Sequence, residues 1–221
     1  MIARLQYITQ DIESVSHQEL ATLACSAGVD WVQLRVKNKS YNEWLNIALK
    51  TEMICRKYHA KFIVNDNVGI AKAVKADGVH LGKTDMNPRE ARQELGSNVI
   101  IGGTANSFED IQTLINTGVD YIGLGPFRFT STKENLSPIL GIEGYKNIIA
   151  ECKKNGIRIP IIAIGGIKIE DVKPLMESGV YGIAVSSAIN LAPNIFDAAK
   201  RFKNKMKFEL ETNEKMSRRF R

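Results

Sequence analysis

Apolar runs of strand length recur along the chain, and most of them end in polar residues. Longer amphipathic segments separate these runs, from Ser16–Ala27 near the start to Asn194–Lys207 near the end. The pattern therefore predicts eight strands that alternate with eight helices. We expect the strands at residues 3–9, 31–37, 61–66, 78–82, 99–104, 121–126, 159–165 and 182–187.

This alternation is typical of an α/β fold of the (β/α)8 TIM barrel type, in which parallel strands bring their carboxyl ends to one rim. Glycines just past the helical patterns fit left-handed helix ends, and Pro88 after Asn87 fits a helix start. A length of 221 residues predicts short loops. The exception is the segment 128–140, which is long and polar, and which we expect to act as a lid. The glycines just past the helical patterns, mentioned above, are Gly28, Gly118, Gly156 and Gly179.

Charge separates the chain into a barrel domain, residues 1–207, and a basic tail, residues 208–221. The net charge of +6 lies within residues 200–221, which hold nine Lys and Arg against three Glu, so the remaining 199 residues hold 21 of each sign. A neutral barrel argues against nucleic acid as a partner. No apolar stretch reaches the ~20 residues that a membrane span needs. Three cysteines without a C-x-x-C pair, and no signal peptide, predict a cytoplasmic protein. The sequence is compatible with a homo-oligomer.

The second predicted strand carries Gln33, Arg35 and Lys37 on one face and apolar residues on the other. Because the apolar face must cover the helices, the polar face points into the barrel. Cations there need anionic partners. The partner is either an anionic substrate at the rim, which we favour, or an acid on a neighbouring strand in a structural ion pair.

Two carboxylates, Asp66 and Asp85, follow the adjacent third and fourth strands. A divalent cation between them would offset their repulsion, and Mg²⁺ suits two carboxylates that share it with substrate phosphates. The alternative is that Asp66 only pairs with Arg35 or Lys37, and that Asp85 only caps the next helix. No His/Cys cluster favours zinc.

Phosphate would fit at two places. Gly165 and Gly166 follow the seventh strand, and Ser186 and Ser187 close the eighth, where TIM barrels often bind phosphate. A second anion could meet Thr130, Thr132 and Lys133 in the long loop, unless these are solvated surface residues. Two phosphate sites and a metal predict two phosphorylated small-molecule substrates.

The three histidines are expected to be noncatalytic. His17 and His59 fall on helices, and we expect both at the surface. His80 alternates with Val79 and Leu81, so it should point inward. We favour a hydrogen-bonded interior role for His80 over a general base.

At this level of detail the chain resembles the thiamine phosphate synthase family, over residues 3 to about 200. The resemblance rests on motifs that occur in order along the barrel: Gln33-Leu34-Arg35-x-Lys37, Val64-Asn65-Asp66, Gly78-Val79-His80-Leu81-Gly82 with Asp85, Gly123-Leu124-Gly125-Pro126 with Thr130-x-Thr132-Lys133, and Ala163-Ile164-Gly165-Gly166-Ile167.

The resemblance implies that a hydroxymethylpyrimidine diphosphate and a thiazole phosphate join to give thiamine phosphate and pyrophosphate, through a pyrimidine carbocation. It implies Asp66 and Asp85 as ligands of Mg²⁺. The remaining assignments are also implied: Arg35, Lys37, Asn65 and Lys133 as catalytic residues that hold the diphosphate; Gln33 beside the pyrimidine; Thr130 and Thr132 beside the thiazole; Gly166, Ser186 and Ser187 at the thiazole phosphate; and Thr104 as a further substrate-binding residue.

The chain also departs from the family pattern. Where this chain has Val36, the family usually has Glu, and where it has Lys83-Thr84, the family usually has Gln-Glu. At the positions of Thr104 and Asn106 the family usually has Ser with a nearby His. Val36 should face outward, and Lys83 would add a cation beside the metal site. Two alternatives therefore remain: a thiazole tautomerase, which shares the barrel but lacks the complete diphosphate and metal set, and a noncatalytic barrel that binds phosphate ligands.

Overall fold

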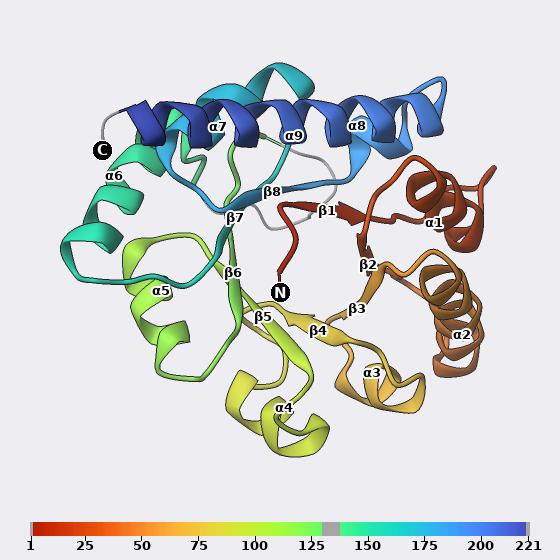
Figure 1. The fold of residues 1–221 in the computed structure, drawn as a ribbon. Coiled ribbons are helices and arrows are strands. Elements are labelled where there is room, and N and C mark those ends of the chain that lie inside the picture. Colours follow the sequence, from red (N-terminus) through yellow and green to blue (C-terminus); the bar gives the residue numbers. More distant parts are fainter. Residues whose placement is uncertain (1, 130–137, 220–221) are drawn as a thin grey trace.

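The strands close into the expected barrel. The computed structural model describes residues 2–129 and 138–219, with side chains up to residue 212. The described residues form eight parallel strands, each paired with its neighbours in chain order, and β1 pairs with β8 (Figure 1). The strands are β1 (Leu5–Ile8), β2 (Trp31–Leu34), β3 (Lys61–Asn65), β4 (Gly78–Leu81), β5 (Ile100–Ala105), β6 (Tyr121–Leu124), β7 (Ile161–Ile164) and β8 (Gly182–Val185).

Helices surround the barrel and begin where the sequence places caps. Ser16, Ser40 and Ser107 each accept a backbone N–H of the helix that follows, and Asn87 precedes a helix with Pro88 at its first position. The helices are α1 (His17–Ser26), α2 (Tyr41–Lys57), α3 (Val68–Ala73), α4 (Pro88–Leu95), α5 (Phe108–Ile115), α6 (Gly141–Lys154), α7 (Val172–Ser178), α8 (Ser187–Asn190) and α9 (Ile195–Arg219), and a short 3-10 helix, η1 (Ile169–Asp171), precedes α7.

The core has two layers, as strand alternation predicts. The outer layer packs the strands against the helices and contains Val32, Leu34 and Val36, so the outward position of Val36 is confirmed. A smaller cluster fills the barrel interior with Ile8, Trp31, Ile63, Tyr121, Ile162 and Ala184. The upper interior is polar, because Gln33, Asn65 and His80 are buried there above the apolar layer.

Two elements differ from the sequence expectation. The second strand ends at Leu34 rather than at residue 37, because the backbone N–H groups of Arg35 and Lys37 bond to side chains of the β1 loop instead of to a strand. The short helix α8 also stands between β8 and the last long helix. All four glycines expected at helix ends have positive φ, from 70° at Gly156 to 96° at Gly179.

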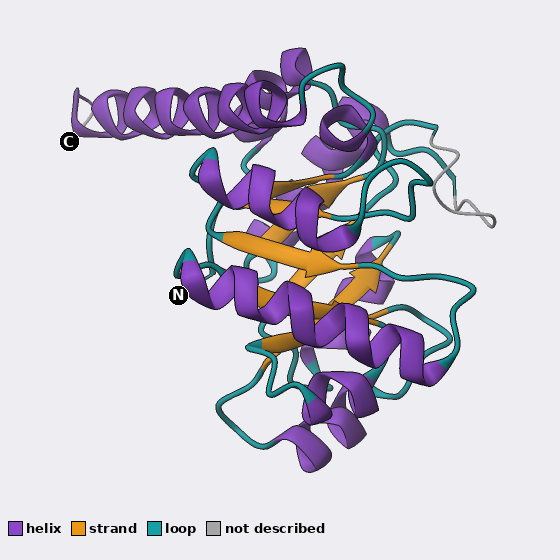
Figure 2. Cartoon of the chain, turned by 90° about the vertical axis from the view of Figure 1, so that its right-hand side faces the viewer, coloured by secondary structure: helices purple, strands orange, loops and turns teal. Residues whose placement is uncertain are grey.

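The side view separates the two ends of the barrel. In Figure 2 the strand arrows point to the side where the longest loops gather, whereas α9 runs toward the opposite end of the barrel. None of the described helices combines the length and hydropathy that a membrane crossing would require. The site residues at the strand ends and the last turns of α9 therefore lie at different ends of the molecule.

Candidate active site

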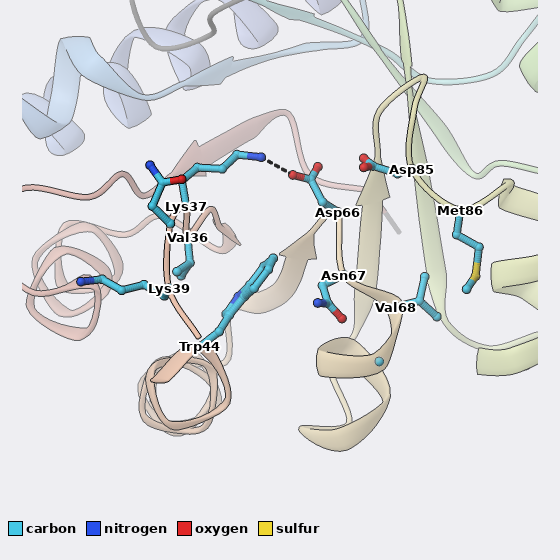
Figure 3. Close-up of a pocket in the computed structure, with 11 residues that line it drawn as sticks. Val36, Lys37, Lys39, Trp44, Asp66, Asn67, Val68, Asp85 and Met86 are labelled. Carbon is cyan, nitrogen blue, oxygen red and sulfur yellow. Dashed lines mark hydrogen bonds and ion pairs between the residues drawn. The ribbon is translucent and has the colours of Figure 1, made fainter. Parts of the chain in front are cut away.

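A cavity opens at the carboxyl ends of β2, β3 and β4. It has a volume of about 400 Å³ and combines charged with apolar walls (Figure 3). Its charged lining residues are Lys37, Lys39, Asp66 and Asp85, and Trp44 and Met86 lie on its apolar sides. The cavity thus brings together one predicted cation and both predicted metal ligands.

Lys37 and Asp66 form an ion pair across the ends of β2 and β3. The Lys37 Nζ lies 2.5 Å from Asp66 Oδ2, and the two side chains are 44% and 23% exposed. Asp66 has a φ of 65°, a left-handed conformation that Asp and Asn adopt more readily than most residues. The expected alternative, in which Asp66 pairs with Lys37, is therefore present in this structure.

Asp85 lies in the β4–α4 loop, and its carboxylate is held by the backbone. Its Oδ2 accepts the N–H of Gly82 at 2.6 Å. Burial raises the pKa of Asp85, the Gly82 hydrogen bond lowers it, and the nearby Asp66 carboxylate raises it again. Asn87, and not Asp85, caps α4, so the alternative that Asp85 only caps this helix is wrong.

The donor set suits a hard divalent cation with few protein ligands. Asp66 and Asp85 offer carboxylate oxygens that are close enough to influence each other, and the cavity beside them leaves room for other ligands. Within residues 2–129 and 138–212, no three His, Cys, Asp or Glu side chains gather as a metal cluster. Such a site fits Mg²⁺ that also binds water and substrate, and it does not fit structural zinc.

Gln33 and Asn65 face the upper interior of the barrel. Gln33 is 2% exposed, and its side chain lies close enough to the Tyr121 hydroxyl to counteract the rise in the pKa of Tyr121 that burial causes. Its Nε2 nevertheless makes no hydrogen bond of standard geometry to the residues that the structure describes. Asn65 ends β3 beside His80 of β4 and is buried. A buried amide donor without an acceptor is costly unless a ligand pairs with it.

His80 belongs to a hydrogen-bonded chain inside the barrel, which agrees with the interior role expected for it. Its Nδ1 lies 3.0 Å from the Tyr121 hydroxyl, which accepts a hydrogen bond from Gln6 Nε2, and its Nε2 lies 3.0 Å from Thr104 Oγ1. A Cβ at Gly102 would overlap both rings, so the glycine makes space for the chain. Thr104 lies near the carboxyl end of β5, and its hydroxyl is hydrogen-bonded to His80 in the barrel interior.

The loop after β7 contains the two glycines that the sequence proposes for a phosphate site. Gly165 and Gly166 both have positive φ, 101° and 65°. Arg128 holds this loop: it donates to the Gly166 carbonyl at 3.0 Å and makes two bonds to the Asp171 carboxylate, at 2.6 and 2.9 Å. Residues at the base of the β6–α6 loop therefore fix the backbone that would face a phosphate.

The end of β8 lies next to this loop in the barrel order. Ser186 and Ser187 follow β8, and the Ser186 hydroxyl donates to Gln10 at 3.2 Å and accepts from Asn190 at 3.1 Å. Both serines are partly exposed. The structure thus brings Gly166, Ser186 and Ser187 to neighbouring strand ends, across the rim from the acidic cavity.

The departures from the family pattern have partners of their own. Lys83 pairs with Asp110 at the start of α5, with 2.6 Å between Nζ and Oδ2. The cation that Lys83 adds to the β4–α4 loop is therefore paired with a carboxylate of α5. The Asn106 side chain donates to the Gly125 carbonyl. Thr130, Thr132 and Lys133, with most of the expected lid, lie outside the described residues.

The expectation that His17 is a surface residue is also wrong. His17 is 6% exposed and contacts Thr9 and Asp11 of the β1 loop. His17, Leu20, Ala21 and Ala24 form the buried stripe of α1, a spacing that the sequence already contains. His59 is exposed as expected, but it follows α2 with a φ of 55°.

A closed (β/α)8 barrel with a charged cavity at the carboxyl ends of its strands is the architecture in which TIM-barrel enzymes place their active sites. Residues 5–189 match the family model described as thiamine monophosphate synthase, and the chain belongs to this family. Similar proteins named thiamine-phosphate synthase occur in Bacteroides fragilis, with 50% identity over 90% of this chain and 98% of the relative, and in Flavobacterium johnsoniae, with 51% identity over 86% and 89%.

One solved structure supports this family at more than 30% identity. Thiamine phosphate pyrophosphorylase from Pyrococcus furiosus superposes with a TM-score of 0.83 at 32% identity, covering 94% of this chain and 96% of that one. The family and these relatives indicate a transferase of the thiamine-phosphate synthase type that acts on small molecules. Family membership covers the whole barrel, whereas α9 extends beyond the matched residues.

Proposed function

We propose that this protein joins a hydroxymethylpyrimidine diphosphate to a thiazole phosphate and releases pyrophosphate. The bond between the pyrimidine methylene carbon and the diphosphate oxygen breaks, and its electron pair leaves with the oxygen. The thiazole nitrogen then donates its lone pair to the methylene carbocation, so that thiamine phosphate forms. Both substrates carry phosphate groups, as the two anion-binding regions of the rim require.

The ion pair of Lys37 with Asp66, next to Asp85, carries this proposal. It places a cation and two metal-type carboxylates around one cavity, where negative charge develops on a leaving diphosphate. Preorganised charges of this kind stabilise a transition state because they need no reorganisation during the reaction. A tautomerase that moves a proton on a thiazole has no leaving diphosphate for such a site to stabilise.

The acidic pair fits a bound Mg²⁺. Asp66 and Asp85 would hold the ion, with waters and substrate phosphate oxygens as its other ligands. When bound, Mg²⁺ supplies positive charge to the diphosphate. The Lys37 ammonium is already held beside Asp66, so its charge stays at the cavity whether or not substrate is present.

Three further residues of the chain would contact the diphosphate. Arg35 follows β2, Asn65 ends β3, and Lys133 belongs to the long loop after β6. Arg35 and Lys133 add charge, whereas Asn65 offers an uncharged donor. Because loss of the diphosphate precedes capture by the thiazole, these residues act on the first step.

Two more groups orient the rings. The Gln33 Nε2, which lacks an acceptor in the described part of the chain, suits a pyrimidine ring nitrogen, and Thr104 borders the same space. The thiazole phosphate would take Gly166, Ser186 and Ser187, with Thr130 and Thr132 beside the thiazole ring. Binding both rings over one interior turns a bimolecular capture into an effectively intramolecular one.

The buried cysteines have no disulfide partners in the described structure, which suits a reducing cytoplasm. We therefore place the reaction in the cytoplasm, and we leave open whether the enzyme is a homo-oligomer.

The decisive experiment incubates the purified protein with both phosphorylated heterocycles and Mg²⁺ and measures thiamine phosphate and pyrophosphate. Equal amounts of the two products are expected, with loss of both in excess chelator. Isomerisation of a thiazole carboxylate phosphate alone, without thiamine phosphate, would identify a tautomerase instead. Tight binding of both substrates without any product would identify a noncatalytic barrel.

A further inference from the structure

A cluster of Thr9, Asp11 and His17, here called the β1 cluster, contacts the backbone of the β2 loop that carries Arg35 and Lys37. Thr9 and His17 are buried, whereas Asp11 lies at the exposed edge of the cluster. Thr9 follows β1, Asp11 lies two residues further along the loop, and His17 is the first residue of α1. The His17 Nδ1 lies 2.8 Å from Thr9 Oγ1, and its Nε2 lies 3.2 Å from Asp11 Oδ1. One imidazole therefore connects both side chains.

The same two side chains hold the backbone of the β2 loop. The N–H of Arg35 donates to Thr9 Oγ1 at 3.2 Å, and the N–H of Lys37 donates to Asp11 Oδ2 at 2.9 Å. Strand pairing between β1 and β2 ends at the pair Ile8 and Gln33. Beyond this point the β1 cluster replaces the sheet as the partner of the β2 backbone.

Donors and acceptors can be assigned to all the hydrogen bonds of the β1 cluster without conflict. Thr9 Oγ1 accepts from the Arg35 N–H, so its own hydroxyl hydrogen can point to Nδ1 of a neutral His17. The remaining hydrogen of that imidazole is on Nε2, where it donates to Asp11. Asp11 then accepts from His17 with one oxygen and from Lys37 with the other. Every member of the cluster is satisfied in this arrangement, which favours one fixed geometry.

We propose that His17 is a positioning residue for the diphosphate site: through Thr9 and Asp11 it fixes the backbone from which the Arg35 and Lys37 side chains reach the substrate. This inference rests on the proposed function, because it concerns the diphosphate contacts of that reaction. It adds residues that touch neither substrate nor metal. A small displacement of a charged group costs catalysis far more than it costs fold stability, since contacts to a transition state depend steeply on position.

The inference predicts a selective defect. Loosening the β2 loop should weaken contacts to the diphosphate and leave the thiazole phosphate site, across the rim at β7 and β8, unchanged. A residue with only a structural role would instead lower the melting temperature and leave both KM values alone. Selectivity between the two substrates therefore separates positioning from stability.

The test compares Thr9→Val, Thr9→Ser and His17→Leu with Ser16→Ala as the matched control. Thr9→Val keeps the shape of the side chain but removes the hydroxyl, and Thr9→Ser retains it. Ser16→Ala removes the N-cap of α1, so it loosens the same helix without removing a bond of the β1 cluster. Melting temperature, kcat, and KM for each substrate are measured for every variant.

Thr9→Val and His17→Leu are expected to raise KM for the pyrimidine diphosphate or to lower kcat by about tenfold, with KM for the thiazole phosphate within about twofold. Thr9→Ser should retain activity, and Ser16→Ala should lose stability only. Hydrogen exchange of the peptide that spans residues 33–38 should quicken in Thr9→Val and not in Ser16→Ala.

Two results would overturn the inference: kinetics of Thr9→Val and His17→Leu that match those of Ser16→Ala, or equal losses for both substrates. A wild-type protein that forms no thiamine phosphate would instead overturn the proposed function, and with it this role. Wild-type turnover is therefore measured first, so that the two failures are distinguished.

Discussion

Lys37 and Asp66 contact each other across adjacent strand ends, with 2.5 Å between Nζ and Oδ2. Both side chains are partly exposed, and a pair of this kind contributes little to stability. Its importance lies in the site, because it keeps a cation and a metal-type carboxylate together before substrate arrives. A metal and a diphosphate that enter the cavity would rearrange this pair, with Asp66 turning to the metal and Lys37 to the phosphate.

Replacing either carboxylate should therefore remove activity while the barrel stays folded. We expect Asp66→Asn and Asp85→Asn each to lower kcat/KM at least about tenfold, or ~1.4 kcal/mol of transition-state stabilisation. Asn is the suitable replacement at residue 66 because it tolerates the φ of 65° found there. Turnover against Mg²⁺ concentration, together with circular dichroism, measures both effects.

Asp30→Asn serves as the control for this prediction. Asp30 also pairs with a lysine, Lys203, at 2.9 Å, but it precedes β2 and so lies at the other end of the barrel. Its replacement should leave the metal dependence unchanged. Full turnover of the wild type in excess chelator would contradict the assignment of both carboxylates.

The barrel could be predicted from the sequence because strand alternation is a local property. Gln33 faces inward and Val36 outward, as a period of two requires, and Ser16 and Asn87 mark helix starts by residue type alone. The positions of Asp66 and Asp85 followed from the rule that parallel strands share a rim. These inferences needed no knowledge of distant contacts.

The β1 cluster was not predicted, because its bonds join side chains to backbone groups far along the chain. The N–H that Thr9 accepts belongs to Arg35, and a backbone group has no sequence signature. The burial of His17 could have been found, since it shares the helical spacing of Leu20, Ala21 and Ala24. The pairing of Lys83 was not predicted either, because its partner Asp110 lies on the next βα unit.

A methyl group at Gly166 should disturb the phosphate loop. The residue has a φ of 65°, and a Cβ would lie 2.8 Å from the Phe129 carbonyl oxygen. Gly156 has a similar φ of 70° but no atom within 4 Å of such a Cβ. Gly156→Ala therefore measures the backbone strain alone, about 1–2 kcal/mol.

We expect Gly166→Ala to be more destabilising than Gly156→Ala and also to raise KM for the thiazole phosphate several-fold. Thermal unfolding and steady-state kinetics of the two variants separate these effects. If Gly166→Ala changes stability but neither KM, the β7 loop does not hold the phosphate.

The end of α9 should be dispensable for catalysis. The helix runs toward the end of the barrel opposite the site loops (Figure 2), and most of the basic residues 200–221 belong to it. Removal of residues 213–221 should leave kcat/KM within about tenfold of the full chain, a limit of ~1.4 kcal/mol. Turnover of the truncated protein measures this, and a larger loss would assign the tail to the site.

The last prediction concerns pH and His17. Burial lowers the pKa of His17 below its ordinary value of 6.5, while the hydrogen bond and charge of Asp11 raise it and Lys39 lowers it. Its position at the start of α1 also disfavours the imidazolium, because the amino end of a helix is positive. The folded protein therefore takes up a proton at lower pH than the unfolded chain.

The stability that neutral His17 contributes is present above pH 6.5 and is lost as pH falls through the lowered folded-state pKa. His17→Gln has no such titration, and its amide can still donate to Asp11. The difference in unfolding free energy between wild type and His17→Gln should thus shrink as pH falls from about 7.5 to about 5. Urea unfolding of both proteins across this range measures it. A difference that grows at low pH would mean that the ion pair of a charged His17 with Asp11 outweighs burial.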